Sequence, residues 1–142
     1  MNKIGITFGA FDLFHAGHVL MLQEADTVCD YMIVCVQRDP SLDRPEKNKP
    51  VQNIVERQLQ VKGCRYVDEV LVYETEQDVL DILAGIQWDV RIIGEEYKNA
   101  PYTGRDEYKD DPKKYIYYNS RQHGFSSSEL RKRREYDNTG NN

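Results

Sequence analysis

The sequence is poor in cysteine and has no long apolar run, and both shortages narrow the class of protein. Only three cysteines, Cys29, Cys35 and Cys64, stand in 142 residues, scattered and odd in number. This usage fits reduced thiols in a cytoplasmic protein rather than a disulfide framework. No apolar run is long enough to cross a bilayer. Asn2 and Lys3 lead straight into a short apolar segment, without the pattern of a signal peptide. We therefore expect a cytoplasmic protein that does not contact a membrane.

An excess of positive charge is also missing. The chain has 19 Lys and Arg against 24 Asp and Glu, a formal net charge of −5. Surfaces that bind nucleic acid without sequence preference are usually basic, so we expect no nucleic-acid partner. An acidic net charge does not exclude a local cationic pocket. The length predicts one domain with a single α/β core. We expect that domain to occupy residues 1–135, followed by a disordered tail over residues 136–142.

The most informative stretch is residues 8–18, which read Phe-Gly-Ala-Phe-Asp-Leu-Phe-His-Ala-Gly-His. It joins a short apolar run to a segment with helical spacing, so it predicts a strand-to-helix turn. Gly9 and Gly17 mark points where a sharp bend or a close ligand is expected. A helix that begins near Gly17 directs unpaired N–H groups and its positive dipole end into the turn, which makes an anion site. His15 and His18 lie at the mouth of that site.

Two other roles for this histidine pair stay open. Two histidines on one turn can bind zinc, but zinc sites need three or four ligands, and no other residue shows matching short spacing. Alternatively, His15 and His18 are partly buried side chains that only cap the start of a helix. The preceding strand and the Gly-x-Phe-Asp sequence favour a ligand-binding turn.

The rest of the chain alternates predicted strands and helices. A continuous apolar run such as residues 32–36 is typical of a buried parallel strand, and strand–helix–strand units are right-handed. We expect an α/β fold with a Rossmann-like, doubly wound, parallel five-stranded sheet. The predicted strands are residues 3–8, 32–36, 65–72, 90–94 and 114–118. The predicted helices are residues 17–28, 52–64, with an apolar side of Ile54, Val55, Leu59 and Val61, and a segment between an N-cap at Thr75 and a stop at Gly85.

The pattern Gly-x-Phe-Asp-x-x-His-x-Gly-His at residues 9–18 resembles the signature of the cytidylyltransferase-like nucleotidyltransferases. The resemblance extends to Arg-Tyr-Val-Asp-Glu-Val at 65–70, to Asp-Val-Arg-Ile-Ile-Gly-Glu-Glu at 89–96, and to Arg-Gln-His-Gly-Phe-Ser-Ser-Ser at 121–128. These four blocks stand in family order and cover roughly residues 1–132. They are most similar to glycerol-3-phosphate cytidylyltransferases, and they imply the HIGH-type nucleotidyltransferase fold.

The resemblance implies one reaction, in which a phosphate oxygen of a small acceptor attacks the α-phosphorus of a nucleoside triphosphate and pyrophosphate leaves. Such catalysis consists mostly of positioning and charge stabilisation. The first expectation is transfer of CMP from CTP to glycerol 3-phosphate. The alternatives are adenylyl transfer from ATP to a sugar, pantetheine or flavin phosphate, and a catalytically weak nucleotide-binding regulator. We expect Mg²⁺ to be carried by the nucleotide phosphates without a dedicated protein site, and a homodimer formed through residues 65–70.

The resemblance also implies roles for individual residues. His15 and His18 are expected at the α- and β-phosphates, with Lys49 and Arg121 offsetting phosphate charge in catalysis. The residues expected to bind the nucleotide are Gly9, Ala10, Phe11, Gly17, Arg65, Gly94, Glu95, Arg121, Ser126 and Ser127. The residues expected to bind the acceptor are Asp12, Lys47 and Arg57, although Asp12 could instead brace the turn by accepting backbone N–H bonds.

Three segments need separate comment: one differs from the family at single residues, one is a predicted loop, and one is longer than in the family. Ser126 and Ser127 replace two threonines but keep their hydroxyl groups, and His123 stands where the family often has an acid. Residues 37–50 contain three prolines and seven charges, which predicts a loop. Residues 97–114 are longer than in the family; they form either a mobile loop over the acceptor site or a solvated loop without a role.

Overall fold

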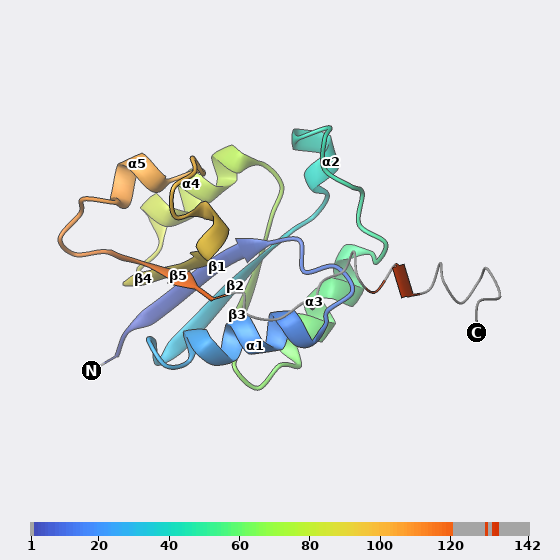
Figure 1. The fold of residues 1–142 in the computed structure, drawn as a ribbon, viewed down its shortest axis with the longest axis horizontal. Coiled ribbons are helices and arrows are strands. Elements are labelled where there is room, and N and C mark those ends of the chain that lie inside the picture. Colours follow the sequence, from blue (N-terminus) through green and yellow to red (C-terminus); the bar gives the residue numbers. More distant parts are fainter. Residues whose placement is uncertain (1, 121–129, 131, 134–142) are drawn as a thin grey trace.

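Five parallel strands form the centre of the molecule (Figure 1). The computed structural model describes residues 2–120, 130, 132 and 133. Within them the strand order is β3-β2-β1-β4-β5, and every neighbouring pair is parallel. The strands are β1 (Ile4–Gly9), β2 (Tyr31–Gln37), β3 (Glu69–Tyr73), β4 (Val90–Gly94) and β5 (Tyr115–Asn119). The predicted α/β architecture with a parallel five-stranded sheet is confirmed.

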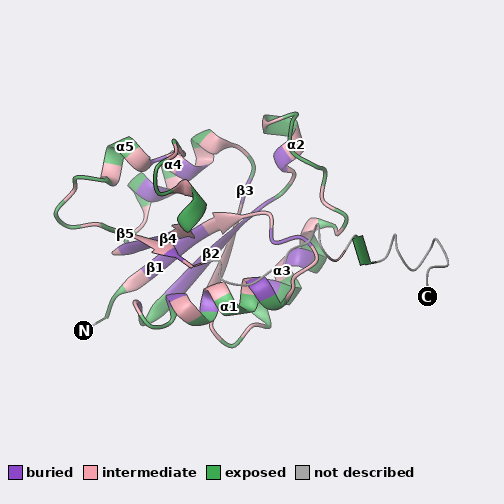
Figure 2. Ribbon diagram, viewed as in Figure 1, coloured by how far each residue is buried: buried purple, intermediate pink, exposed green. Residues whose placement is uncertain are grey.

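Helices cover both faces of the sheet (Figure 1). On one face, α1 (Ala16–Ala25) and α3 (Ile54–Lys62) bury Leu22 and Val61 against the strands. On the other face, α4 (Glu76–Gly85) buries Val79 and Leu83 beside Trp88. The two clusters are the apolar core, and the central strands are buried between them (Figure 2). None of the described helices is long and apolar enough to cross a bilayer.

Local capping sets the ends of these helices. Thr75 is the N-cap of α4, as predicted, and forms a capping box with Asp78, while Asn53 and Glu56 form another at the start of α3. α1 ends earlier than predicted, at Ala25, because the Thr27 and Val28 N–H groups bond to the carbonyls of Glu24 and Ala25, three residues back, and tighten the turn.

The predicted apolar side of α3 is wrong in part. Val55 is 59% exposed and Leu59 is 68% exposed, so neither faces the core. The buried positions of this helix are Arg57 and Val61. A buried arginine on the core face turns the two apolar side chains toward solvent.

Both segments predicted to be loops contain short helices. In residues 37–50, α2 (Pro40–Asp43) begins because the Asp39 carboxylate accepts from the Ser41 N–H at 3.0 Å. Residues 97–114 contain α5 (Arg105–Tyr108), and the 3-10 helix η1 (Glu95–Tyr97) ends where this segment begins. This second segment is tied to the body of the protein: the Tyr102 and Tyr118 hydroxyls lie 2.7 Å apart. The predicted tail over residues 136–142 lies outside the described residues.

Candidate functional site

A cavity of about 890 Å³ opens at the carboxyl ends of the strands. Each of the five strands contributes its last residue to the wall: Gly9, Gln37, Tyr73, Gly94 and Asn119. In doubly wound sheets this edge is where ligands bind, because the connecting segments diverge there and leave a crevice.

The turn after β1 forms one wall and holds a strained backbone. Phe11 and Leu13 both adopt positive φ angles, of 52° and 50°, which non-glycine residues rarely do. The Asp12 carboxylate holds this conformation by accepting from the backbone N–H groups of Val51 and Gln52 at 2.9 and 3.0 Å. Asp12 is 8% exposed and does not line the cavity; its two backbone bonds are those of the bracing role, and acceptor contact stays a prediction.

His15 and His18 both line the cavity and form a reciprocal cap on α1. The His15 Nδ1 accepts from the Gly17 N–H at 3.0 Å, and the His18 Nδ1 accepts from the His15 N–H at 3.2 Å. Because both Nδ1 atoms accept, each neutral ring carries its proton on Nε2, which makes Nε2 a hydrogen-bond donor. The two rings stack with centroids 3.8 Å apart. The capping alternative is therefore correct as local structure, and the same two rings line the cavity.

The zinc alternative gains no support from this arrangement. Within residues 2–120, 130, 132 and 133, no group of three or more His, Cys, Asp or Glu side chains could hold a metal ion.

Cationic side chains also line the cavity, and of these the sequence predicts only Lys47. Arg44 and Arg91 also line the cavity. Arg91 is 5% exposed, and its guanidinium lies 5.0 Å from the Phe8 ring centroid and 5.2 Å from that of Tyr102. Burial lowers the pKa of Arg91, because desolvation disfavours its charged form. A single charge inside the apolar strand at residues 90–94 was the signal that sequence reasoning overlooked.

Arg91 is held by the segment that follows β4. Its Nη1 donates to the Thr103 carbonyl, and the Thr103 hydroxyl donates to the Glu76 carboxylate at 2.9 Å. Tyr73 lies nearby, and burial raises the pKa of its hydroxyl while Arg44 and Arg91 oppose that shift. Residues 97–104 therefore form part of the cavity wall.

Among the described residues, the structure brings most of the predicted site residues together. The predicted residues that line the cavity are Gly9, Ala10, Phe11, His15, Gly17, His18, Lys47 and Gly94. Predictions for Arg121, Ser126 and Ser127, and the doubt about His123, lie outside the described residues.

Arg57 occupies a different place from the predicted acceptor site. Its side chain is 1% exposed and does not line the cavity. Nε donates to the Gln52 carbonyl, and the two Nη atoms donate to the carbonyls of Ala10, Gln37 and Arg38. The guanidinium therefore ties α3 to the ends of β1 and β2, and its predicted contact with an acceptor stays a prediction.

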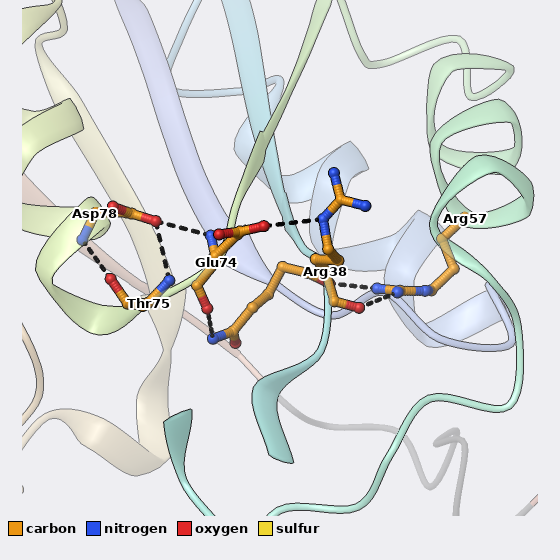
Figure 3. A network of polar contacts seen from close by, with 6 residues as sticks. Arg38, Arg57, Glu74, Thr75 and Asp78 are labelled. Carbon is orange, nitrogen blue, oxygen red and sulfur yellow. Dashed lines mark hydrogen bonds and ion pairs between the residues drawn. The ribbon is translucent and has the colours of Figure 1, made fainter. Parts of the chain in front are cut away.

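This brace belongs to a longer chain of polar contacts beside the cavity (Figure 3). Arg38 pairs with the Glu74 carboxylate at 3.2 Å, and the Asp78 carboxylate accepts from the backbone of Glu74 and Thr75. The chain links α3, the end of β2 and the start of α4.

Three further predicted residues stand outside the cavity wall. Arg65 is exposed and precedes the amino end of β3, so it lies at the opposite edge of the sheet. Glu95 does not line the cavity, whereas Glu96 does, because its carboxylate folds back over Gly94 where a Cβ would collide with it. Lys49 is exposed and also absent from the wall.

Comparison with known proteins gives consistent matches. Residues 6–133 match the family model described as cytidylyltransferase-like. The chain is 35% identical to ethanolamine-phosphate cytidylyltransferase of Dictyostelium discoideum, over 93% of this chain and 38% of that protein. It is 36% identical to bifunctional protein HldE of Acidiphilium cryptum, over 74% of this chain and 22% of that protein. The chain thus spans well under half the length of these curated relatives.

Solved structures share the fold at lower sequence identity. A lipopolysaccharide core biosynthesis protein from Thermoplasma volcanium superposes with a TM-score of 0.68 at 20% identity, covering 84% of this chain and 98% of that one. A pantoate-beta-alanine ligase from Francisella tularensis gives a TM-score of 0.57 at 16% identity, covering 92% and 65%. At these identities the likeness concerns the fold alone.

Proposed function

Because this chain belongs to the cytidylyltransferase-like family, we propose that it transfers a cytidylyl group from CTP to a small phosphorylated acceptor and releases pyrophosphate. The observation that carries the proposal is the stacked histidine pair on the first turn of α1, facing a cavity closed by the last residue of every strand. Glycerol 3-phosphate is the first acceptor we propose. Phosphoethanolamine is the competing acceptor, because relatives are named for it.

The mechanism requires no protein nucleophile, since the acceptor phosphate supplies the attacking oxygen. The Nε2–H groups of His15 and His18 donate to the α- and β-phosphate oxygens, where negative charge increases in the transition state. Their Nδ1 atoms accept backbone N–H bonds, which orients both rings before substrate arrives. Lys47 reaches the same cavity and offsets phosphate charge. Preorganised donors of this kind cost no reorganisation during the reaction.

Further ligands enter the proposal from the family resemblance. Lys49 and Arg121 would offset phosphate charge, and Ser126 and Ser127 would bind the β- and γ-phosphates at a helix start. We also propose Mg²⁺ as an ion carried by the nucleotide, where it would neutralise phosphate charge. The described residues offer no converging set of three metal ligands, so they fit an ion that arrives on phosphate oxygens rather than one held by the protein.

We propose a homodimer that uses the edge of the sheet at residues 65–70. Strand β3 is an edge strand, and α3 exposes Val55 and Leu59 just before it in the chain. Exposed apolar surface beside an open edge supports an interface. Light scattering after size exclusion should give twice the chain mass, and Leu59→Glu should give the monomer mass. A monomer for the unmodified chain would contradict the proposed homodimer.

We also propose a cytoplasmic location, which the free state of Cys29, Cys35 and Cys64 supports.

The activity is tested by pyrophosphate release. CTP and ATP are each offered with glycerol 3-phosphate, phosphoethanolamine and sugar phosphates, and His18→Ala serves as the inactive control. Turnover with CTP that is lost in His18→Ala supports cytidylyl transfer. Turnover with ATP alone would keep the mechanism and replace the nucleotide. Nucleotide binding without release for every pair would leave a binding regulator and contradict the enzyme proposal.

A further inference from the structure

The cavity has a second chemical environment on the α4 face of the sheet. We call Arg44, Tyr73, Glu76, Arg91, Tyr102 and Thr103 the α4-side wall; all six line the cavity. Along β4, Val90 and Ile92 belong to the core cluster under α1 and α3, so Arg91 points to the other face. The histidine pair lies on the α1 side. The cavity therefore has two regions, one at the histidine pair and one at the α4-side wall.

Arg91 is the unusual member of this wall. It is nine-tenths buried, it takes part in no ion pair among the described residues, and its Nε has no hydrogen-bond partner there. The Nη1 bond to the Thr103 carbonyl and the two ring contacts offset only part of the desolvation of this cation, because it has no ion pair among the described residues and its Nε–H is unpaired there. Such a side chain lining a cavity indicates that an oxygen-bearing ligand completes its environment.

The wall around Arg91 combines donors with an acceptor. Arg44 has the same unpartnered Nε in the described part of the chain, and Tyr73 lies in the electrostatic range of both guanidinium groups. Glu76 supplies the carboxylate, oriented by the Thr103 hydroxyl at 2.9 Å. The α4-side wall therefore presents two guanidinium groups and one carboxylate to the same space.

This mixture distinguishes between acceptor tails. An ammonium group would bind Glu76 but would face two guanidinium groups in a low-dielectric space. A carboxylate would bind Arg91 but would face Glu76. A hydroxyl group both accepts and donates, so it satisfies the guanidinium groups and the carboxylate together.

We propose that the α4-side wall binds the part of the acceptor beyond its phosphate, and that Arg91 and Arg44 select a hydroxylated tail over an ammonium tail. This inference rests on the proposed nucleotidyl transfer and specifies its acceptor class: a polyol or sugar phosphate. The acceptor phosphate then lies between this wall and the histidine pair, where Lys47 also lines the cavity. The relatives named for ethanolamine phosphate would differ from this chain in acceptor choice.

The test compares acceptors that share a phosphate and differ in their tails. Pyrophosphate release from CTP is measured with glycerol 3-phosphate, phosphoglycolate and phosphoethanolamine. The value of kcat/KM for glycerol 3-phosphate should exceed that for phosphoethanolamine by about tenfold or more, as expected for a buried polar site that discriminates by pairing. An equal or higher value for phosphoethanolamine would overturn the inference while the proposed function stands. No release with any acceptor would overturn both.

Variants locate the selectivity. Arg91→Gln and Arg44→Gln should each raise KM for glycerol 3-phosphate about tenfold and lower its preference over phosphoethanolamine, with KM for CTP unchanged. Lys109→Gln removes one positive charge on α5's C-cap, away from the cavity, and should match the unmodified chain. If Arg91→Gln fails to fold, shown by thermal unfolding, the half-buried Arg44 provides the readout. Folded variants with unchanged selectivity would contradict the assignment.

Discussion

At the scale of single residues, His15 has two functions that substitution can separate. Its Nδ1 accepts the cap bond from Gly17, and its Nε2 is the proposed phosphate donor. Asparagine is a strong N-cap residue, because its side-chain oxygen accepts the same backbone bond. Alanine provides neither function.

We therefore predict different outcomes for two substitutions. His15→Asn should keep the unfolding free energy near that of the unmodified chain but lower kcat by about 10²-fold. His15→Ala should lower kcat similarly and also destabilise the fold by about 1 kcal/mol. Urea unfolding and steady-state pyrophosphate release measure the two effects. Equal stability of both variants would show that the cap contributes nothing, and full activity in His15→Asn would remove His15 from the reaction.

At the scale of elements, α3 depends on a buried arginine. Arg57 donates to carbonyls from three separate stretches, at Gln52, Ala10 and Gln37–Arg38. Removing the guanidinium leaves these buried acceptors without partners, each at a cost of about 1–3 kcal/mol. The arginine thus connects α3 to the ends of β1 and β2 by polar bonds, beside the apolar cluster that contains Val36 and Val61.

Arg57→Met should accordingly lower the unfolding free energy by about 3 kcal/mol or more. Guanidinium chloride unfolding monitored by circular dichroism measures the change. Lys62→Met, at the exposed end of the same helix, is the matched control and should shift stability little. Unchanged stability in Arg57→Met, together with a raised KM for the acceptor, would instead support the acceptor role expected from sequence.

The same helix explains where prediction from sequence succeeds and where it fails. Strand β4 is predicted to the residue, because its apolar run and terminal glycine are local signals. Arg57 on a core face contradicts the apolar period of α3, and its partners lie up to 47 residues away in the chain. Arg91 resembles an ordinary surface charge until the strand order places it against residues 97–104. Hydrophobic periodicity reports only on neighbouring residues, so it cannot predict the distant partners of a buried charge.

The same contrast between local signals and distant contacts holds for the site residues. The turn at residues 9–18 is predictable because strand, glycine, histidines and helix are contiguous. Lys47 and Lys49 stand two residues apart in one segment, yet only Lys47 lines the cavity. Strand β3 begins at Glu69, later than the predicted strand at residues 65–72, and Arg65 stands at the opposite edge because it precedes β3 while the cavity lies at the carboxyl ends of the strands.

At the scale of the whole molecule, buried thiols predict how stability depends on alkaline pH. Burial raises the pKa of Cys35 from 9.0 to about 12 and that of Cys29 to about 11. Above pH 9 the unfolded chain releases these protons while the native chain retains them, so the unfolded state binds fewer protons. The unfolding free energy must then fall as pH rises, and the stability contribution is lost by about pH 12.

We predict that the unfolding free energy falls steeply as pH rises in the alkaline range, because the two buried thiols lose their protons more readily in the unfolded chain. Between pH 9 and 11, stability from urea unfolding should fall by at most about 1.4 kcal/mol per pH unit for Cys35, with a further part from Cys29. Cys35 lies on β2 and is fully buried, so Cys35→Ala also lowers the unfolding free energy at neutral pH. The variants are therefore compared by the slope of the unfolding free energy against pH and not by its absolute value. Cys35→Ala should flatten this slope, whereas Cys64→Ala retains both buried thiols and hence the steep slope. An identical slope in Cys35→Ala would mean that other groups, such as Tyr73 with its raised pKa, control alkaline unfolding.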